Sequence, residues 1–301
     1  MKFFGQWTKC LSLPQSNIHM FLTECPRDAM QGWGTFIPTD QKIDYINSLM
    51  TVGFDVLDCG SFVSPKAIPQ MADSGQVIDQ IDRSGSSTKL SVIVANIRGA
   101  EKALAHNNVD ILGFPFSISE TFQFRNTNKD QQEAFRQIKE IKSMADKEGR
   151  KLNIYFSMAF GNPYGEQWKI ENVEQWVESF LEIGVSELQL ADTTGVATPE
   201  LIGQVFDVLI TKYPQVTFGA HFHNRYEDSY LKIDAAYLKG CRSFDTAIKG
   251  IGGCPMAKDD LVGNLPTEQL INYMQLKGVT HSLNLLHFES AYNKAKDIFH
   301  F

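Results

Sequence analysis

The sequence predicts an α/β fold: a (β/α)8 TIM barrel, a single domain over residues 1–301 with a C-terminal helix packed outside. Eight short apolar, β-branched or aromatic runs can be counted, and segments with helical periodicity lie between most of them. No composition break or low-complexity linker interrupts this alternation. Eight strand–helix units in a chain of 301 residues are typical of a parallel barrel.

The expected strands are short and evenly spread. In chain order they are Asn17–Cys25, Phe54–Gly60, Lys89–Asn96, Val109–Ser117, Asn153–Gly161, Glu187–Thr193, Val216–Asn224 and Ser243–Gly250. A doubly wound open sheet is the alternative arrangement. It would place a glycine-rich phosphate-binding motif after the first strand, and Cys25–Gln31 is not one.

Helices are expected between the strands. Thr39–Val52 places its apolar residues on one face, and Asp130–Gly149 and Glu171–Gly184 behave similarly. The last two end at a glycine, a common helix stop signal. Thr198 is an N-cap candidate followed by proline at the first helical position. The stretch from about Ser282 to Phe301 is expected to form the external terminal helix.

Composition narrows the functional classes. The formal net charge of −7 argues against a general nucleic-acid binder. Five cysteines with no CxxC pair argue against a disulfide framework or a structural zinc site, and fit a reducing cytosol. The N-terminus lacks the apolar run of a signal peptide, and no apolar stretch approaches membrane-spanning length. We therefore expect a cytoplasmic protein without a nucleic-acid or membrane partner.

The seventh expected strand ends in two histidines, His221 and His223. Residues two apart on a strand point to the same face, so both imidazoles would aim at one point. That spacing suits two nitrogen ligands of one divalent cation, if a carboxylate and other oxygens converge from elsewhere. The competing interpretation is two unrelated histidines, one packed and one solvated.

Polar residues gather at the other strand ends, where barrels place their chemistry. They are Arg27, Asp28 and Gln31 after the first strand, Asp58 at the second, Asp192 at the sixth, and the Gly250–Pro255 loop with Asn264 after the eighth. Taken singly, Asp58 and Asp192 could be helix N-caps, and Arg27 with Asp28 a surface pair. Together they are the parts needed to break or make a carbon–carbon bond beside a thioester or carboxylate. The cation would polarise a substrate oxygen and the arginine would stabilise an enolate. Two histidines and a carboxylate also serve hydrolases and non-heme iron oxygenases.

Several stretches resemble the 3-hydroxy-3-methylglutaryl-CoA (HMG-CoA) lyases, a branch of the metal-dependent barrel enzymes that include isopropylmalate and homocitrate synthases. Cys25–Gln31 resembles the Arg-Asp-Gly-x-Gln motif of the larger group, and Ser61–Asp73 is similar to a segment of the lyase branch. Gly250–Ala257, with the glycine–glycine–cysteine–proline sequence, is similar to the lyase signature loop. Ala191–Val196 and His221–Asn224 match in between.

The resemblance implies a divalent-metal-dependent acyl-CoA lyase. Asp28, His221, His223 and Asn264 would hold Mg2+ or Mn2+. Arg27 would stabilise the enolate, Asp58 would take the place of a glutamate near the substrate, and Asp192 would orient the substrate hydroxyl or exchange a proton with it. Arg27 and Gln31 would contact substrate, and Cys254 would sit on a mobile loop that closes over the site. A homodimer is expected.

The resemblance also carries alternatives and departures. HMG-CoA as substrate would give acetyl-CoA and acetoacetate; a synthase joining acetyl-CoA to a 2-keto acid is the runner-up, and a non-catalytic metal- or CoA-binding protein is a further possibility. Trp33 and Gly34 stand where the family has polar residues, which favours a smaller or more apolar acyl group. Trp33 could instead pack against the following helix.

Overall fold

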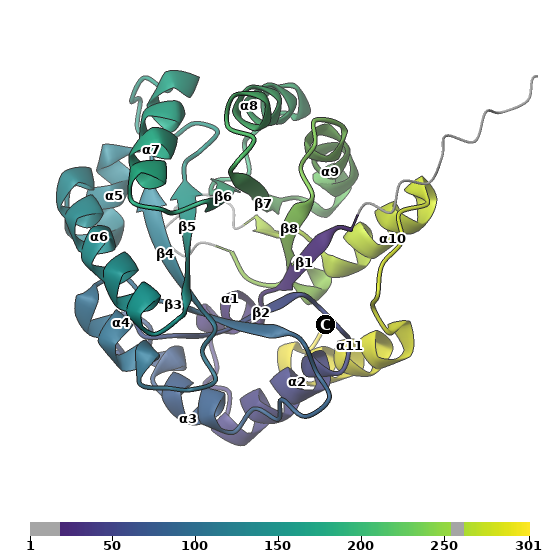
Figure 1. Cartoon of the computed structure of the whole chain (residues 1–301). Coiled ribbons are helices and arrows are strands. Elements are labelled where there is room, and N and C mark those ends of the chain that lie inside the picture. Colours follow the sequence, from purple (N-terminus) through teal and green to yellow (C-terminus); the bar gives the residue numbers. More distant parts are fainter. Residues whose placement is uncertain (1–18, 254–261) are drawn as a thin grey trace, which may run out of the picture.

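Eight parallel strands form a closed barrel in the computed structural model, which describes residues 19–253 and 262–301 (Figure 1). The strands are β1 (Phe21–Glu24), β2 (Val56–Ser61), β3 (Lys89–Ile93), β4 (Ile111–Ser117), β5 (Lys151–Ser157), β6 (Glu187–Asp192), β7 (Thr217–Asn224) and β8 (Ser243–Thr246). Each pairs with its sequence neighbours, β1 pairs with β8, and β6 pairs with β7. The (β/α)8 barrel is therefore confirmed, and the open doubly wound sheet is wrong.

Helices surround the barrel in the described part of the chain. They are α1 (Pro26–Gln31), α2 (Thr39–Met50), α3 (Ser74–Asp79), α4 (Ile97–Leu104), α5 (Glu120–Thr127), α6 (Gln131–Lys147), α7 (Ile170–Glu182), α8 (Pro199–Lys212), α9 (Ser229–Leu238), α10 (Thr267–Lys277) and α11 (Leu285–Phe299). Thr198 caps α8 by accepting a hydrogen bond from Leu201 N, as its position before a proline predicted. Gly149 and Gly184, just beyond α6 and α7, have positive φ angles.

The C-terminal helix α11 lies outside the barrel against α2 (Figure 1). Phe299 makes edge-to-face contacts with Trp33 and Tyr45, with ring centroids 5.2 and 6.1 Å apart. Aromatic pairs in this geometry stabilise a contact beyond the area they bury. The predicted external terminal helix is confirmed.

Two short elements place side chains at the carboxyl end of the barrel. Pro26 at the first helical position begins α1 directly after β1, which sets Arg27 and Asp28 at the rim. The two-residue strand β9 (Gly263–Asn264) pairs antiparallel with the end of β7, with His223 opposite Asn264.

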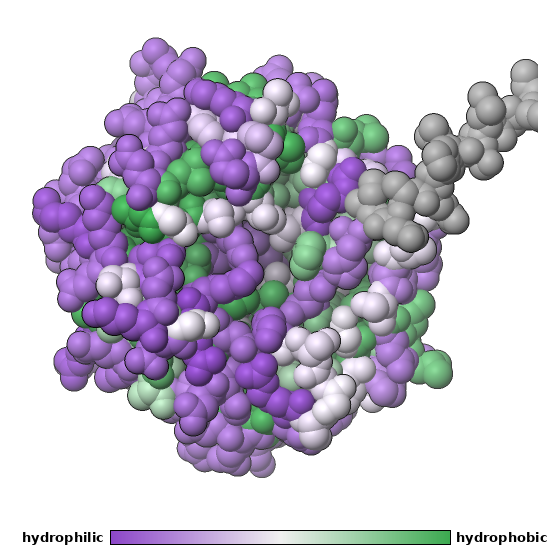
Figure 2. Space-filling model, viewed as in Figure 1, coloured by the Kyte–Doolittle hydropathy of each residue, from purple (hydrophilic) through white to green (hydrophobic). Residues whose placement is uncertain are grey.

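The outside of the molecule is mainly hydrophilic on the face seen in Figure 2, with small hydrophobic patches between the helices. The main core cluster fills the layer between strands and helices. Among the described residues, every helix is too short or too polar to span a bilayer.

Candidate active site

A cavity of about 410 Å³ lies over the carboxyl ends of the barrel strands. Its polar lining includes five residues predicted from the strand ends or their motifs: Arg27, Asp28, Gln31, His221 and His223. Ser157 and Thr193 add hydroxyl groups, while Ile93, Pro115 and Tyr155 belong to its apolar wall. The structure therefore brings together residues from β1–α1 and β7 that are almost 200 positions apart, as barrel closure requires.

The two histidines point to one place. Their Nε2 atoms are 3.2 Å apart, and a carboxylate oxygen of Asp28 joins them so that the three ligand atoms lie within 4.8 Å of one another. Two neutral imidazoles beside a carboxylate are the donor set that a divalent transition metal prefers. This geometry agrees with the prediction made from the period-two spacing on the strand.

The pKa values of the two imidazoles shift in opposite directions, and the shift of His223 favours the neutral form that binds a cation. Burial lowers the pKa of His223 to about 3, with the neighbouring His221 acting in the same direction. Burial also lowers the pKa of His221, but the hydrogen bond and charge of Asp245 outweigh it and leave the pKa raised. Asp245 Oδ2 is 3.1 Å from His221 Nδ1 and therefore orients this imidazole with Nε2 toward the cavity.

Arg27 joins two buried carboxylates. Its Nε donates to both Asp58 oxygens at 3.2 and 3.1 Å, a terminal nitrogen donates to Asp58 Oδ2, and the other donates to Asp28 Oδ1 at 2.7 Å. Burial raises the pKa of the Asp28 carboxyl, but Arg27 and then the two histidines outweigh it and leave the pKa lowered. Burial raises the pKa of Asp58 despite Arg27. Asp28 is thus the carboxylate prepared to bind a cation.

Asn264 reaches the same point from β9. Its Nδ2 donates to Asp28 Oδ2 at 2.7 Å and to the Ile251 carbonyl at 3.0 Å. With the nitrogen committed to two acceptors, Oδ1 is the carboxamide atom left for a cation. Gln31 donates to Asp28 Oδ1 at 2.7 Å and so orients the carboxylate while it lines the cavity.

The donor set fits a divalent cation on an observation independent of any relative. The Nε2 atoms of His221 and His223 face each other beside the buried Asp28 carboxylate. A cation between those nitrogens would satisfy both lone pairs and the Asp28 charge.

Three further predicted site residues either do not line the cavity or lie outside the described residues. Asp192 does not line the cavity: Ala191 and Thr193 do, so the residue between them points outward, where its carboxylate binds Lys232 Nζ at 2.6 Å. Asp58 is fully buried and touches the site through Arg27 rather than through the cavity lining. Neither aspartate is a helix N-cap. Cys254 lies outside the described residues.

Trp33 also lies away from the cavity lining. It is half-buried and packs against Phe299 of α11. The packing alternative is therefore correct in kind. Its partner is the terminal helix rather than the one that follows.

Sequence reasoning missed Asp245 and Lys232. Asp245 is directly in register with His221 on the neighbouring strand. A signal existed in the sequence: an aspartate within the expected strand Ser243–Gly250 is costly to bury unless it is paired. Lys232 gave less warning, because a lysine on a surface helix is ordinary.

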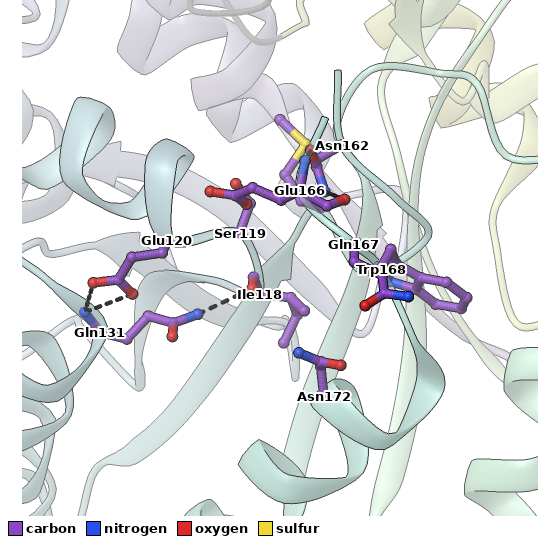
Figure 3. Close-up of a pocket in the computed structure, with 10 residues that line it drawn as sticks. Ile118, Ser119, Glu120, Gln131, Asn162, Glu166, Gln167, Trp168 and Asn172 are labelled. Atoms are coloured by element: carbon purple, nitrogen blue, oxygen red, sulfur yellow. Dashed lines mark hydrogen bonds between the residues drawn. The ribbon is translucent and has the colours of Figure 1, made fainter. Parts of the chain in front are cut away.

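A second, smaller pocket of about 290 Å³ lies beside the ends of β4 and β5 (Figure 3). Glu120 and Glu166 are its carboxylates. Glu166 accepts a hydrogen bond from Thr121 N at 2.8 Å, and Glu120 accepts from Gln131 N. Both carboxylates are thus occupied in holding backbone, and the pocket lacks a convergent ligand set like that of the first cavity.

Comparison with known proteins matches the sequence of this chain to one protein family. The family model described as HMGL-like matches residues 18–294. The chain is 33% identical to a cytoplasmic 3-hydroxy-3-methylglutaryl-CoA lyase of Danio rerio, covering 92% of this chain and 82% of the relative. It is also 33% identical to a hydroxymethylglutaryl-CoA lyase of Bacillus subtilis, covering 86% of each.

Solved structures agree. An HMG-CoA lyase from Acinetobacter baumannii, in complex with coenzyme A and 3-methylmalate, has a TM-score of 0.86 and 31% identity over 94% of this chain and 92% of that one. The Bacillus subtilis HMG-CoA lyase structure has a TM-score of 0.88 and 30% identity over 95% of both chains.

Proposed function

This chain belongs to the HMGL-like family, and from that membership we propose that it is a divalent-metal-dependent carbon–carbon lyase that cleaves HMG-CoA to acetyl-CoA and acetoacetate. The observation that carries the proposal is the convergence of His221, His223 and Asp28 beside Arg27 in one cavity. The match with relatives named for this activity extends over most of the length of each relative. One related structure was solved with coenzyme A.

The site residues divide the chemistry between them. Asp28, His221, His223 and Asn264 would hold the cation, and two imidazoles favour Mn2+ over Mg2+. When bound, the cation would act as a Lewis acid on substrate oxygens. Arg27 would stabilise the negative charge on the thioester oxygen as the bond between C2 and C3 breaks. Asp58 would hold the guanidinium in place, and Gln31 would fix the Asp28 carboxylate.

Cys254 and the cellular setting remain proposals from sequence and relatives. We propose Cys254, in the segment between Gly253 and Val262, as a catalytic thiol. A cytoplasmic location is supported by the relatives named cytoplasmic. A homodimer stays a prediction.

The test is a cleavage assay on HMG-CoA, with release of acetoacetate measured after chelation and after Mn2+ or Mg2+ is restored. We expect turnover only with metal, and a loss of about 100-fold or more in His223→Ala. His106→Ala is the matched control, because His106 pairs with Asp79 away from the cavity, and should keep full turnover. Cleavage that survives metal removal would refute the metal mechanism, and condensation of acetyl-CoA with a 2-keto acid would establish the synthase instead.

A further inference from the structure

Lys232 is a buried lysine with all three of its N–H donors in use. Its side chain is 3% exposed, and Nζ donates to Asp192 Oδ2 at 2.6 Å, to the Gly195 carbonyl at 3.0 Å and to the His223 carbonyl at 3.2 Å. An ammonium group has only three donors, so it is fully satisfied. From α9 it thus joins the end of β6, the turn after β6 and the end of β7.

The third contact matters because His223 lies where the pairing of β7 in the barrel ends. The parallel pairing of β7 with β6 ends at Phe222, and its pairing with β8 ends at His221. His223 lies beyond both ladders. Of the neighbouring elements, β9 pairs with it, and Lys232 binds its carbonyl oxygen. The ammonium group is thus one of the contacts that hold the backbone carrying this imidazole.

Asp192, at the end of β6, is the carboxylate that pairs with Lys232. Its carboxylate is 2% exposed and accepts hydrogen bonds from Lys232 and from Ala197 N at 3.2 Å. Gly195, in the intervening turn, has a φ of +72° and approaches so closely that a Cβ would lie 3.1 Å from the His223 carbonyl oxygen and 2.8 Å from Val262 Cγ2. Val262 precedes Gly263 and Asn264 of β9. The turn thus packs against the His223 carbonyl and against the Val262 side chain, two residues before Asn264.

We propose that the Asp192–Lys232 ion pair is a positioning device that sets the backbone at the end of β7, and with it His223 and the paired Asn264, for cation binding. The inference rests on the proposed metal site. It gives Asp192 a role through Lys232 and His223, in place of direct proton exchange with the substrate hydroxyl.

The test measures Mn2+ affinity without substrate, from the free-ion signal in an electron paramagnetic resonance titration of the full chain. Lys232→Met and Asp192→Asn should each weaken Mn2+ binding by about 10- to 100-fold, the range seen when groups that orient metal ligands are removed. The double variant should be no weaker than the worse single one, because the two residues act as one unit.

Lys42→Met is the matched control. Lys42 is equally buried and pairs with Asp73 at 2.7 Å, but it fixes α2 and the 70–73 segment rather than β7. It should lower stability and leave Mn2+ affinity unchanged. If Lys232→Met does not fold, Asp192→Asn and the double variant carry the comparison.

The outcomes separate the two proposals. A wild-type chain that binds no Mn2+ would overturn the metal site and this inference with it. Wild-type binding with unchanged affinity in the Asp192 and Lys232 variants would overturn the inference alone. So would an equal loss in Lys42→Met. A fall in kcat for Asp192→Asn at unchanged Mn2+ affinity would return Asp192 to the role expected from sequence.

Discussion

Arg27 holds two buried carboxylates at once while one face of its side chain lines the cavity. Removing the Arg27 side chain would leave the charges of Asp28 and Asp58 without their cationic partner. Such a change in a buried site lowers the free energy of unfolding by several kcal/mol. A variant that keeps the positive charge is therefore more informative than a neutral one. The planar fork matters here because Nε and one terminal nitrogen bind Asp58 while the other terminal nitrogen binds Asp28.

We expect Arg27→Lys to fold and bind Mn2+ but to cleave HMG-CoA about 100-fold more slowly. A single ammonium cannot pair with Asp28 and Asp58 and also face the thioester oxygen. Steady-state kinetics and an Mn2+ titration would separate the two effects. Arg83→Lys, at a guanidinium that binds Asp110 outside the cavity, should behave as wild type. Full activity in Arg27→Lys would show that the fork is not needed.

The strand face on which a residue lies could be predicted where the spacing of residues in the sequence determines it. His221 and His223 share a face because the strand repeats every two residues. The same repeat could not decide the face of Asp192, since strands of a parallel barrel are buried on both sides and show no polar alternation. Leu188 and Leu190, on the outward face with Asp192, are as buried as the inward residues. Only the three-dimensional register reveals that Asp192 points away from the cavity.

Glu24 connects three elements below the site. It is fully buried on β1 and accepts hydrogen bonds from Ile248 N at 2.8 Å, Thr246 Oγ1 at 3.3 Å and Thr267 Oγ1 at 2.5 Å. It therefore links β1 to the end of β8 and to the start of α10. Burial raises its pKa to about 8, against the hydrogen bonds from Thr267, Ile248 and Thr246.

This shift predicts that stability falls as pH rises. Between the ordinary value of 4.5 and about 8, the folded chain holds a proton on Glu24 that the unfolded chain has released. The contribution of protonated Glu24 to the free energy of unfolding is complete below pH 4.5. It is lost as the pH rises through 8, by at most about 1.4 kcal/mol per pH unit. Glu24→Gln should remove the loss, so its advantage over wild type in urea unfolding should grow from pH 5 to pH 8. Glu140→Gln, exposed on α6, should show no such trend.

Elements marked by an apolar run or a helical period could be predicted from the sequence, and elements without such a mark could not. All eight strands and the helices α2, α6, α7 and α8 follow from apolar runs, periodicity and stop signals. The six-residue α1 is too short to show a period, and β9 exists only because two residues pair with the end of β7. These are the elements that carry Asp28 and Asn264. The parts of the site least visible to sequence reasoning are thus those created by tertiary contact.

Closure of the whole barrel brings residues from opposite ends of the chain to one point. Asp28 accepts a hydrogen bond from Asn264, 236 positions later, and both lie beside the imidazoles of β7. A cation held by all four would join the first strand–helix unit to the last. Because the unfolded chain has no such preformed site, the binding free energy would add to the free energy of unfolding.

We therefore expect metal to stabilise the fold as well as support catalysis. With Mn2+ at 100 times its dissociation constant, the free energy of unfolding should exceed that of the chelated protein by about 2.7 kcal/mol. Urea unfolding with and without chelator measures this difference. His223→Ala removes one ligand and should lose most of it, whereas His106→Ala should retain it in full. Equal stabilisation of His223→Ala and wild type would mean that Mn2+ binds elsewhere on the folded chain.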